Sequence, residues 1–553
     1  MKFLTAFQKS ASPVLSLSGA IPSTQALMGR TVSTRFFPHS SPRRPLSIGY
    51  QVRRHADTLA NRDGSKVGSV AVFSSSSGND DDTTSILSSK RGRNAVKLLP
   101  IYLADARAVT KYDPIKSPDG ALQLGVAESL IIQDWLLPAV NLDDLQLPPD
   151  ALYYQPTQGR LDCRTAMMEY IQSDLLDLSD SQSGIQRQLD IDGIVVGAGC
   201  NAVLENLCFC LAEPGDAVLL PTPYYAAFEF DLVARAGLTV QPVRTQDYVS
   251  ATKTTLAMDD AKVEAFKYFP NTTSLDAAYE KAVQSGHTPR ILLLSHPHNP
   301  LGVCYPPSIV KECIDWCRSR QVHLISDEIY AGSVYRPGHA RFESALKLAA
   351  TTSSSDSSTP GLGLGPFIHW VYAFSKDYCL SGMRVGCAYS ENEEIRVPMQ
   401  KLNDMCQISA QTQLWTTTTL QRRMDDGELW TSAFRRENHK RLDDRAQRLT
   451  KVLDECGISY LQPESGLFVW LDLSDFLDPP TVPNQSDMEE DSKRERKLYL
   501  ELVNDFGLLL TPGLSMRNEE PGFFRCVFTA ASDDEFEISL DRFRKFAASK
   551  QVK

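Results

Sequence analysis

The stretch VHLISDEIY, residues 322–330, begins as an apolar run and ends in Asp327-Glu328-Ile329-Tyr330. Residues 322–326 are typical of a buried strand. Ligands of open α/β sheets bind beyond the carboxyl ends of the strands, so Asp327 stands where a site is expected. An acid in this place is also commonly a helix cap, and both interpretations stay open at this point.

Similar short apolar runs are separated by longer helical patterns along the chain. They cover residues 194–197, 217–220, 238–243, 291–295 and 370–374. This alternation predicts an α/β domain with a mostly parallel central sheet. After residue 396 a long polar helical pattern runs through 448, followed by strand-like runs at 466–473 and 525–530.

The chain has 553 residues, more than one compact core usually holds. We predict a large cofactor-binding domain at 151–395, and a smaller α+β domain built from 100–150 and 396–553. Three polar stretches are expected to be surface insertions. They are residues 247–275, 351–366 and 478–494.

The charge is unevenly distributed. The chain has 57 basic and 68 acidic side chains, a net charge of −11, yet residues 1–56 contain bases and no Asp or Glu. This head is typical of an organelle-targeting presequence, and a disordered tail is the alternative. Residues 57–99 are expected to be a linker. We therefore expect an intracellular protein, mitochondrial or in another organelle if the head is a presequence and cytoplasmic otherwise.

Composition also argues against several classes of protein. The acidic total is unfavourable for a general nucleic-acid binder, and no apolar run approaches the length that spans a bilayer. The twelve cysteines include no C-x-x-C pair. We expect mostly reduced, buried thiols and no metal site.

Three further segments could carry chemistry. Lys376 follows the run 370–374 and could be an amine whose pKa is lowered in an apolar site, or a solvated Lys in a turn. Asn299 lies in an Asn-Pro pair, which also favours a simple turn. The turn Gly197–Asn201 precedes a helical pattern, where free N–H groups would suit a phosphate, although it lacks the G-x-G-x-x-G spacing.

Taken in order, these segments resemble the fold-type I pyridoxal-phosphate enzymes, the aspartate aminotransferase superfamily. Within it the chain resembles the 1-aminocyclopropane-1-carboxylate synthase family and its aminotransferase-like relatives. The likeness covers about residues 110–545. The segments that carry it are Gly125–Glu128, Pro221–Tyr225, Ser326–Tyr330, Ser375–Asp377, Gly382–Gly386 and Pro521–Arg525.

The resemblance implies an aspartate-aminotransferase-like fold, pyridoxal 5'-phosphate as cofactor, an α-amino acid as small-molecule substrate, and a homodimer. It implies that Lys376 forms a Schiff base with the cofactor and moves the substrate α-proton, while Asp327 pairs with the ring nitrogen. The other implied cofactor contacts are Tyr330, Asn299, Tyr225, Ser375, Arg384, Cys200 and Asn201. Arg525 would bind the substrate carboxylate, and Glu128 stands where the synthases recognise substrate.

Two positions depart from the family pattern. Thr157 replaces a Tyr that reaches the phosphate of the neighbouring subunit, and Ala373 replaces a phosphate-binding Ser. The resemblance implies a transaminase most simply. The alternatives are a 1-aminocyclopropane-1-carboxylate synthase or a carbon–sulfur lyase and, from another class, a non-catalytic binding relative. The presence of Lys376 favours an enzyme.

Overall fold

The computed structural model describes residues 89–141, 147–178, 188–246, 265–336, 341–350, 361–481 and 487–551. All of these belong to one compact unit, residues 82–553. The head 1–56 and the linker up to residue 88 lie outside the described residues, and so does a part of each of the three expected insertions. Those parts are residues 247–264, 351–360 and 482–486.

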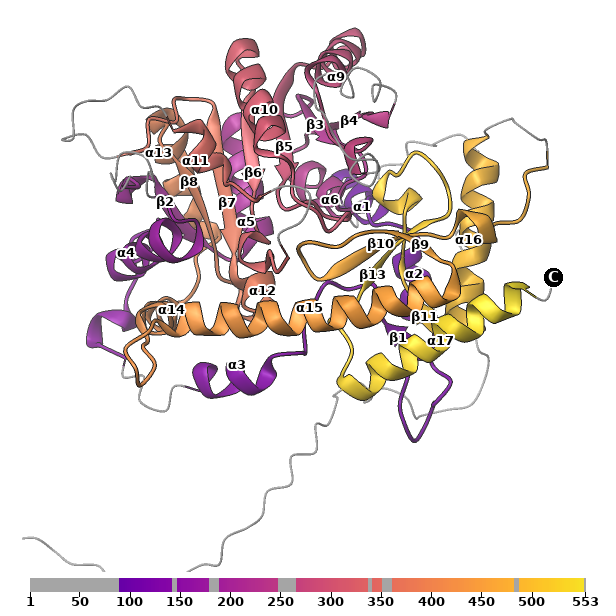
Figure 1. The fold of residues 1–553 in the computed structure, drawn as a ribbon. Helices are drawn as coiled ribbons and strands as arrows, with labels where there is room; N and C mark the ends of the chain where they lie inside the picture. The colour runs from indigo at the N-terminus through magenta and orange to yellow at the C-terminus, as the bar shows by residue number, and fades with distance from the viewer. Residues whose placement is uncertain are drawn as a thin grey trace, which may run out of the picture. The chain divides into compact units, whose positions relative to one another are not determined.

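A seven-stranded sheet forms the centre of the larger part of this unit (Figure 1). Its order is β2 (Ile194–Gly197), β8 (Gly386–Ser390), β7 (Ile368–Ala373), β6 (His323–Asp327), β5 (Pro289–Ser295), β3 (Ala217–Pro221) and β4 (Thr239–Val243). Strand β8 is antiparallel to both neighbours, and the other pairs are parallel. The predicted mostly parallel α/β sheet is confirmed. The sequence missed β8, because the Gly, Ala and Ser in GCAYS have weak strand preference.

Both faces of the sheet are buried, and the side chains of each strand alternate between them. In β5, Leu292 and Leu294 enter one apolar cluster, while Ile291 and Leu293 enter another. The first cluster is completed by α4 (Leu161–Glu169), α9 (Thr272–Gln284), α10 (Pro307–Arg320), α11 (Ala345–Ala349) and α14 (Ala410–Gln421). The second is completed by α5 (Cys200–Leu211), α6 (Phe228–Val233) and α13 (Glu393–Leu402). Helices on both faces hold the carboxyl edge of the sheet in place.

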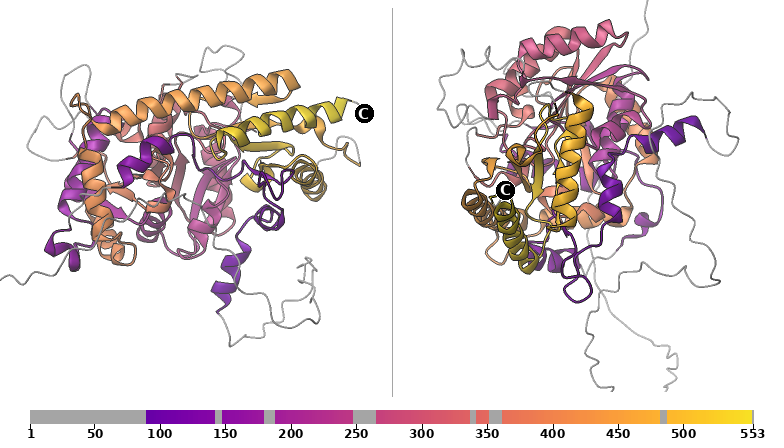
Figure 2. Two further views of the ribbon diagram at one scale, coloured as in Figure 1. Left: turned by 90° about the horizontal axis from the view of Figure 1, so that it is seen from below. Right: turned by 90° about the vertical axis from the view of Figure 1, so that its right-hand side faces the viewer.

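A smaller α+β part joins the two ends of the described chain. Four strands form an antiparallel sheet in the order β12 (Thr511–Pro512), β13 (Phe523–Val527), β10 (Phe468–Asp472) and β9 (Ser459–Leu461). The early strand β1 (Leu122–Gln123) pairs in parallel with β11 (Leu508–Leu509). The helices of this part are α2 (Tyr102–Ala108), α16 (Met488–Asn504) and α17 (Asp533–Gln551). Helix α17 lies beside α15 (Trp430–Cys456), as Figure 2 shows.

Helix α15 contributes to both cores. Trp430 and Phe434, near its start, pack in the large-sheet cluster, whereas Leu442 and Leu449 pack in the cluster of the small part. The long helical pattern expected from 396 to 448 is therefore three helices, α13, α14 and α15. The Ser409 hydroxyl accepts a hydrogen bond from the Thr412 N–H and starts α14 as an N-cap.

Several predicted limits differ from the structure. Helices α13 and α14 pack against α5 and α4, so residues assigned to the small domain from 396 onward lie with the large sheet as far as α14. Helix α3 (Gln133–Val140), also assigned to the small domain, buries Leu136 and Ala139 in the large-sheet cluster. The expected linker contains α1 (Lys90–Lys97), capped by Ser89.

The expected insertions are narrower than predicted, because α9 starts at Thr272 and α16 at Met488. No helix within the described ranges is long and apolar enough to cross a membrane.

Candidate active site

A cavity of about 380 Å³ lies at the carboxyl edge of the large sheet, where it meets the small part. Among the residues predicted for the site, all but Glu128 line this cavity. They are Cys200, Asn201, Tyr225, Asn299, Asp327, Tyr330, Ser375, Lys376, Arg384 and Arg525. The fold thus brings together side chains that are more than 300 residues apart in sequence, as far as Arg525 from Cys200.

Lys376 lies on the short helix α12 (Phe374–Asp377), which follows β7 directly. Its Nζ donates a hydrogen bond of 2.6 Å to the Ala127 carbonyl. Burial, with Arg525 nearby as the second cause, lowers the pKa of Lys376 to about 8. The amine is therefore neutral in about a tenth of the molecules at pH 7 and in about half at pH 8, which supplies the form that a nucleophile or general base requires.

Asp327 ends strand β6 and is 5% exposed. Its Oδ1 accepts hydrogen bonds from the Ile329 N–H at 3.2 Å and from the Cys200 thiol at 3.6 Å. Burial raises the pKa of Asp327 to about 7, and the two donors oppose that rise. A cationic group placed opposite this buried carboxyl would stabilise its ionised form.

Arg384 and the start of α5 form a compact cradle. Arg384 has a left-handed backbone with φ of 54°, and its guanidinium donates to the Ser381 carbonyl and the Asn201 side chain, each at 2.8 Å. A Cβ on Gly199 would overlap that guanidinium, and one on Gly386 would lie 2.6 Å from the Gly199 carbonyl carbon. Glycine at both positions therefore permits the close approach of Arg384 to the helix start.

This cradle suits a phosphate. The first amide groups of a helix have no partner inside the helix, and α5 begins at Cys200. A dianion there gains from the helix dipole and from the guanidinium. Arg384 is exposed in this chain, unlike Lys376 and Arg525.

Arg525 lies on β13 of the small part and is 3% exposed. Its two terminal nitrogens donate to the Asn299 side chain at 2.8 Å and to the Gly125 carbonyl at 2.7 Å. Within the described part of the chain, neither the Arg525 Nε nor the Tyr330 hydroxyl has a hydrogen-bond partner. Buried donors without partners are rare, so both are available to a ligand.

The residues present fit pyridoxal phosphate. A phosphate cradle, a carboxyl for a ring nitrogen and a poised amine share one cavity with two orphaned donors. Tyr225 lines the same cavity from the segment after β3, and burial raises its pKa to about 12, which keeps the phenol neutral. Its ring can therefore serve as an apolar face for a flat cofactor.

Glu128 is the one predicted residue outside the cavity lining. Its side chain is exposed, and its Oε1 accepts a 3.0 Å hydrogen bond from the hydroxyl of Ser381, which does line the cavity. The sequence in turn missed Tyr102 and Asp231, which line the cavity from α2 and α6. No motif marks either residue, since both positions depend on how helices pack over the site.

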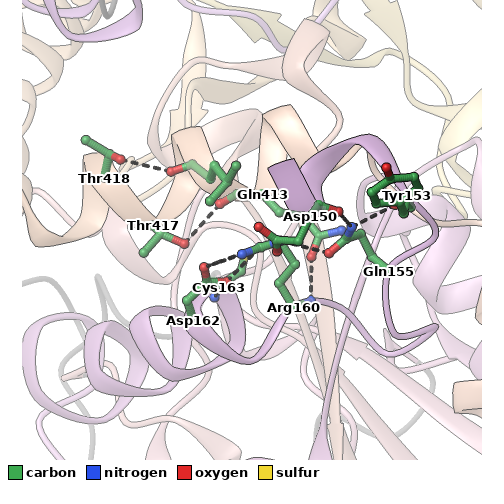
Figure 3. Close-up of polar contacts among 10 residues, drawn as sticks. Asp150, Tyr153, Gln155, Arg160, Asp162, Cys163, Gln413, Thr417 and Thr418 are labelled. Atoms are coloured by element: carbon green, nitrogen blue, oxygen red, sulfur yellow. Dashed lines mark hydrogen bonds and ion pairs between the residues drawn. The ribbon is translucent and has the colours of Figure 1, made fainter. Parts of the chain in front are cut away.

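The segment around Thr157 is fixed within its own chain. Arg160 pairs with Asp150 at 2.7 Å and with Asp162 at 3.0 Å, which ties the loop to the start of α4 (Figure 3). Thr157 does not line the cavity, and its carbonyl accepts a hydrogen bond from the Asn403 amide. Ala373 is fully buried beside Gly386 in the sheet. Neither Thr157 nor Ala373 therefore contributes a hydrogen-bond donor to the cavity of this chain.

The described cysteines are all unpaired, and no group of His, Cys, Asp or Glu within the described ranges could hold a metal ion. The cavity is lined by the amine of Lys376, the carboxyl of Asp327 and the guanidinium groups of Arg384 and Arg525.

Comparisons with known proteins agree with this geometry. Residues 129–543 match the sequence model of the family described as aminotransferase class I and II. The 1-aminocyclopropane-1-carboxylate synthase 5 of Arabidopsis thaliana is 31% identical over 447 residues, 79% of this chain and 85% of that protein. Synthase 11 of the same plant is 33% identical over 359 residues, 65% of this chain and 69% of that protein.

Solved structures share the fold at lower identity. Aspartate aminotransferase from Thermotoga maritima superposes with a TM-score of 0.59 at 20% identity, covering 83% of this chain and 100% of that chain. An aromatic aminotransferase from Pyrococcus horikoshii gives 0.57 at 19% identity, covering 78% and 97%.

Proposed function

We propose that this chain, which belongs to the aminotransferase class I and II family and is a pyridoxal-phosphate-dependent enzyme, transfers the amino group of an α-amino acid to a 2-oxo acid. The observation that carries the proposal is the cavity itself. It brings into one space the amine of Lys376, the buried carboxyl of Asp327 and the guanidinium of Arg525, whose Nε has no hydrogen-bond partner within the described residues.

Each residue has a role that follows from its position. When bound, the cofactor supplies an electron sink for negative charge at the substrate Cα. Arg525 binds and orients the substrate carboxylate through its planar fork of donors. The Nζ of Lys376 takes the proton from Cα and would deliver it to the bound cofactor, as amino transfer requires, a task that suits an amine with a pKa of about 8. Transamination needs no recognition of a leaving group, so these residues suffice for it.

A second candidate is supported by a specific observation. The relatives named as 1-aminocyclopropane-1-carboxylate synthases are about 30% identical to this chain, and Glu128 is present where the resemblance implies substrate recognition. Cyclisation of S-adenosylmethionine would use the same Lys376, Asp327 and Arg525. Elimination by a carbon–sulfur lyase would use them as well, so the reactions differ in the substrate pocket.

A product assay separates these reactions. The purified holoenzyme is incubated with a panel of amino acids, 2-oxo acids and S-adenosylmethionine. A transaminase produces a new amino acid from the added 2-oxo acid. Methylthioadenosine without amino transfer identifies a synthase, and ammonia with pyruvate and a thiol identifies a lyase; either result overturns the transaminase proposal. The Lys376→Ala variant is the control and should form no product.

Assembly as a homodimer is also part of the proposal, because proteins of this family are typically dimeric. Light scattering on the holoenzyme should give twice the chain mass of 61.4 kDa. A fully active monomer would contradict the dimer.

The acid-free, basic residues 1–56 support import into mitochondria or another organelle. A fluorescent protein fused behind these residues should accumulate in the organelle. A diffuse cytoplasmic signal would contradict this location.

A further inference from the structure

We propose that Cys200 is a positioning residue for Asp327: its thiol holds Oδ1 of the carboxylate, so that Oδ2 is left to face the ring nitrogen of the cofactor. The inference rests on the proposed function only through the cofactor. It holds equally for a transaminase, a synthase or a lyase.

The contacts of Asp327 are divided between its two oxygens. Oδ1 accepts from the Ile329 N–H at 3.2 Å and from the Cys200 thiol at 3.6 Å. Both of these hydrogen bonds end on Oδ1 and neither on Oδ2, and the side chain lines the cavity. Two donors on one oxygen fix the rotation of the carboxylate and leave the other oxygen for a ligand.

Cys200 is suited to act as a permanent donor. It is 9% exposed, it begins α5, and it also lines the cavity. Burial and the neighbouring Asp327 raise the pKa of the Cys200 thiol well above its ordinary range. The sulfur therefore keeps its proton at neutral pH and donates that proton to the carboxylate rather than competing with it.

The donor matters because other groups around Asp327 act against its charge. Burial raises its pKa, and the carboxyl groups of Asp231 on α6 and of neighbouring Glu328 raise it further. The phenols of Tyr225 and Tyr330 face the same space and are kept neutral by burial. The Ile329 N–H and the Cys200 thiol are the two groups that lower the pKa of Asp327.

Loss of the thiol should therefore change the position of the proton that Asp327 shares with the ring nitrogen of the cofactor. Without one of the two donors the carboxyl binds a proton more tightly, and the proton on the ring nitrogen shifts toward Asp327. A pair that is less ionised holds the cofactor less firmly. A thiol is a weak donor, so loss of its hydrogen bond corresponds to roughly a three- to tenfold loss of affinity.

The test uses four variants of the full chain. Cys200→Ala and Cys200→Val remove the donor, and Val keeps most of the volume. Cys200→Ser keeps a donor. Cys210→Ala is the matched control, because Cys210 lies on the same helix, is half-buried and does not line the cavity.

Two measurements are made that do not depend on turnover. The first is the dissociation constant of the apoprotein for pyridoxal phosphate, by fluorescence quenching. The second is the ¹⁵N NMR shift of ring-labelled cofactor in the holoprotein across pH, which reports protonation of the ring nitrogen. We expect the Ala and Val variants to bind about three- to tenfold more weakly and to lose the ring proton at lower pH. Cys200→Ser and Cys210→Ala should match the native protein.

Native affinity and a native nitrogen titration in Cys200→Val would overturn the proposal. Equal losses in Cys200→Ser and Cys200→Val would also overturn it, since the effect would then follow from packing and not from the donor. If Cys200→Ala fails to fold, the Val and Ser pair still decides the question. A failed amino-transfer assay with intact cofactor binding would reject the transaminase and leave this inference standing.

Discussion

The two ends of the cavity are built in different ways. At the proposed cofactor end, Asp327 ends strand β6 and Lys376 lies just after the adjacent strand β7 of the same sheet, so their separation is set by strand pairing. At the substrate end, Arg525 comes from β13 of the small part, and Tyr102 and Gly125 come from the early part of the chain. One end depends on a single rigid sheet, and the other depends on how distant segments meet. Cofactor chemistry is therefore more firmly determined than substrate choice.

The largest expected effect is a loss of turnover at the substrate end of the cavity with cofactor binding preserved. Arg525→Lys should lower kcat/KM for α-amino acids by roughly 10²-fold, because an ammonium cannot reproduce two parallel hydrogen bonds to a carboxylate. Cofactor affinity should change by less than about threefold. Steady-state kinetics and cofactor titration measure both quantities, with the exposed Arg544→Lys as control. Equal losses of affinity and turnover would show that the ends are not independent.

The reverse experiment acts on the cofactor end. Arg384→Ala should weaken pyridoxal phosphate binding by about 10- to 50-fold, through lost charge-assisted bonds in an exposed place. At saturating cofactor, KM for the amino acid should stay native. Equilibrium dialysis of the cofactor checks the first statement and initial rates check the second. A raised KM with native cofactor affinity would assign Arg384 to the substrate instead.

A smaller, pH-dependent effect concerns Lys376. A lowered folded-state pKa means that the neutral amine is present already at about pH 8 and is lost as the pH falls. The rate at which apoprotein takes up cofactor, followed by absorbance, should rise about tenfold from pH 7 to pH 9 and then level off. A free lysine derivative should keep rising to pH 10. The same continued rise in the protein would contradict the lowered pKa.

The smallest effect is expected at Glu128, which lies outside the cavity lining. Its charge opposes the lowering of the Lys376 pKa, and it accepts from Ser381 at the rim. Glu128→Gln keeps that acceptor, so KM for a neutral amino acid should change by no more than about threefold. A much larger loss with S-adenosylmethionine alone would favour the synthase, since a carboxylate can recognise a sulfonium.

The same contrast explains what could be predicted from sequence. The strands are marked by their short apolar runs. Asn299, Asp327 and Lys376 could be predicted because they lie at or just after the ends of these runs. Tyr102 and Asp231 are not, because their place over the cavity results from helix packing between distant segments. The thiol of Cys200 was also missed, since only its amide belongs to the phosphate turn. The division of the pattern at 396–448 into three helices follows from packing on two different cores.

Helix α15 has a mechanical consequence. Its 27 residues extend about 40 Å as one rod embedded in two cores. About a third of the way along, the Asn438 amide contacts the carbonyl of Asp377, next to Lys376, and His439 contacts the carbonyl of Gly332 at 2.7 Å. A rotation of the small part that moves Arg525 would also displace helix α15. The displacement would be transmitted through the Asn438 contact to helix α12, which carries Lys376.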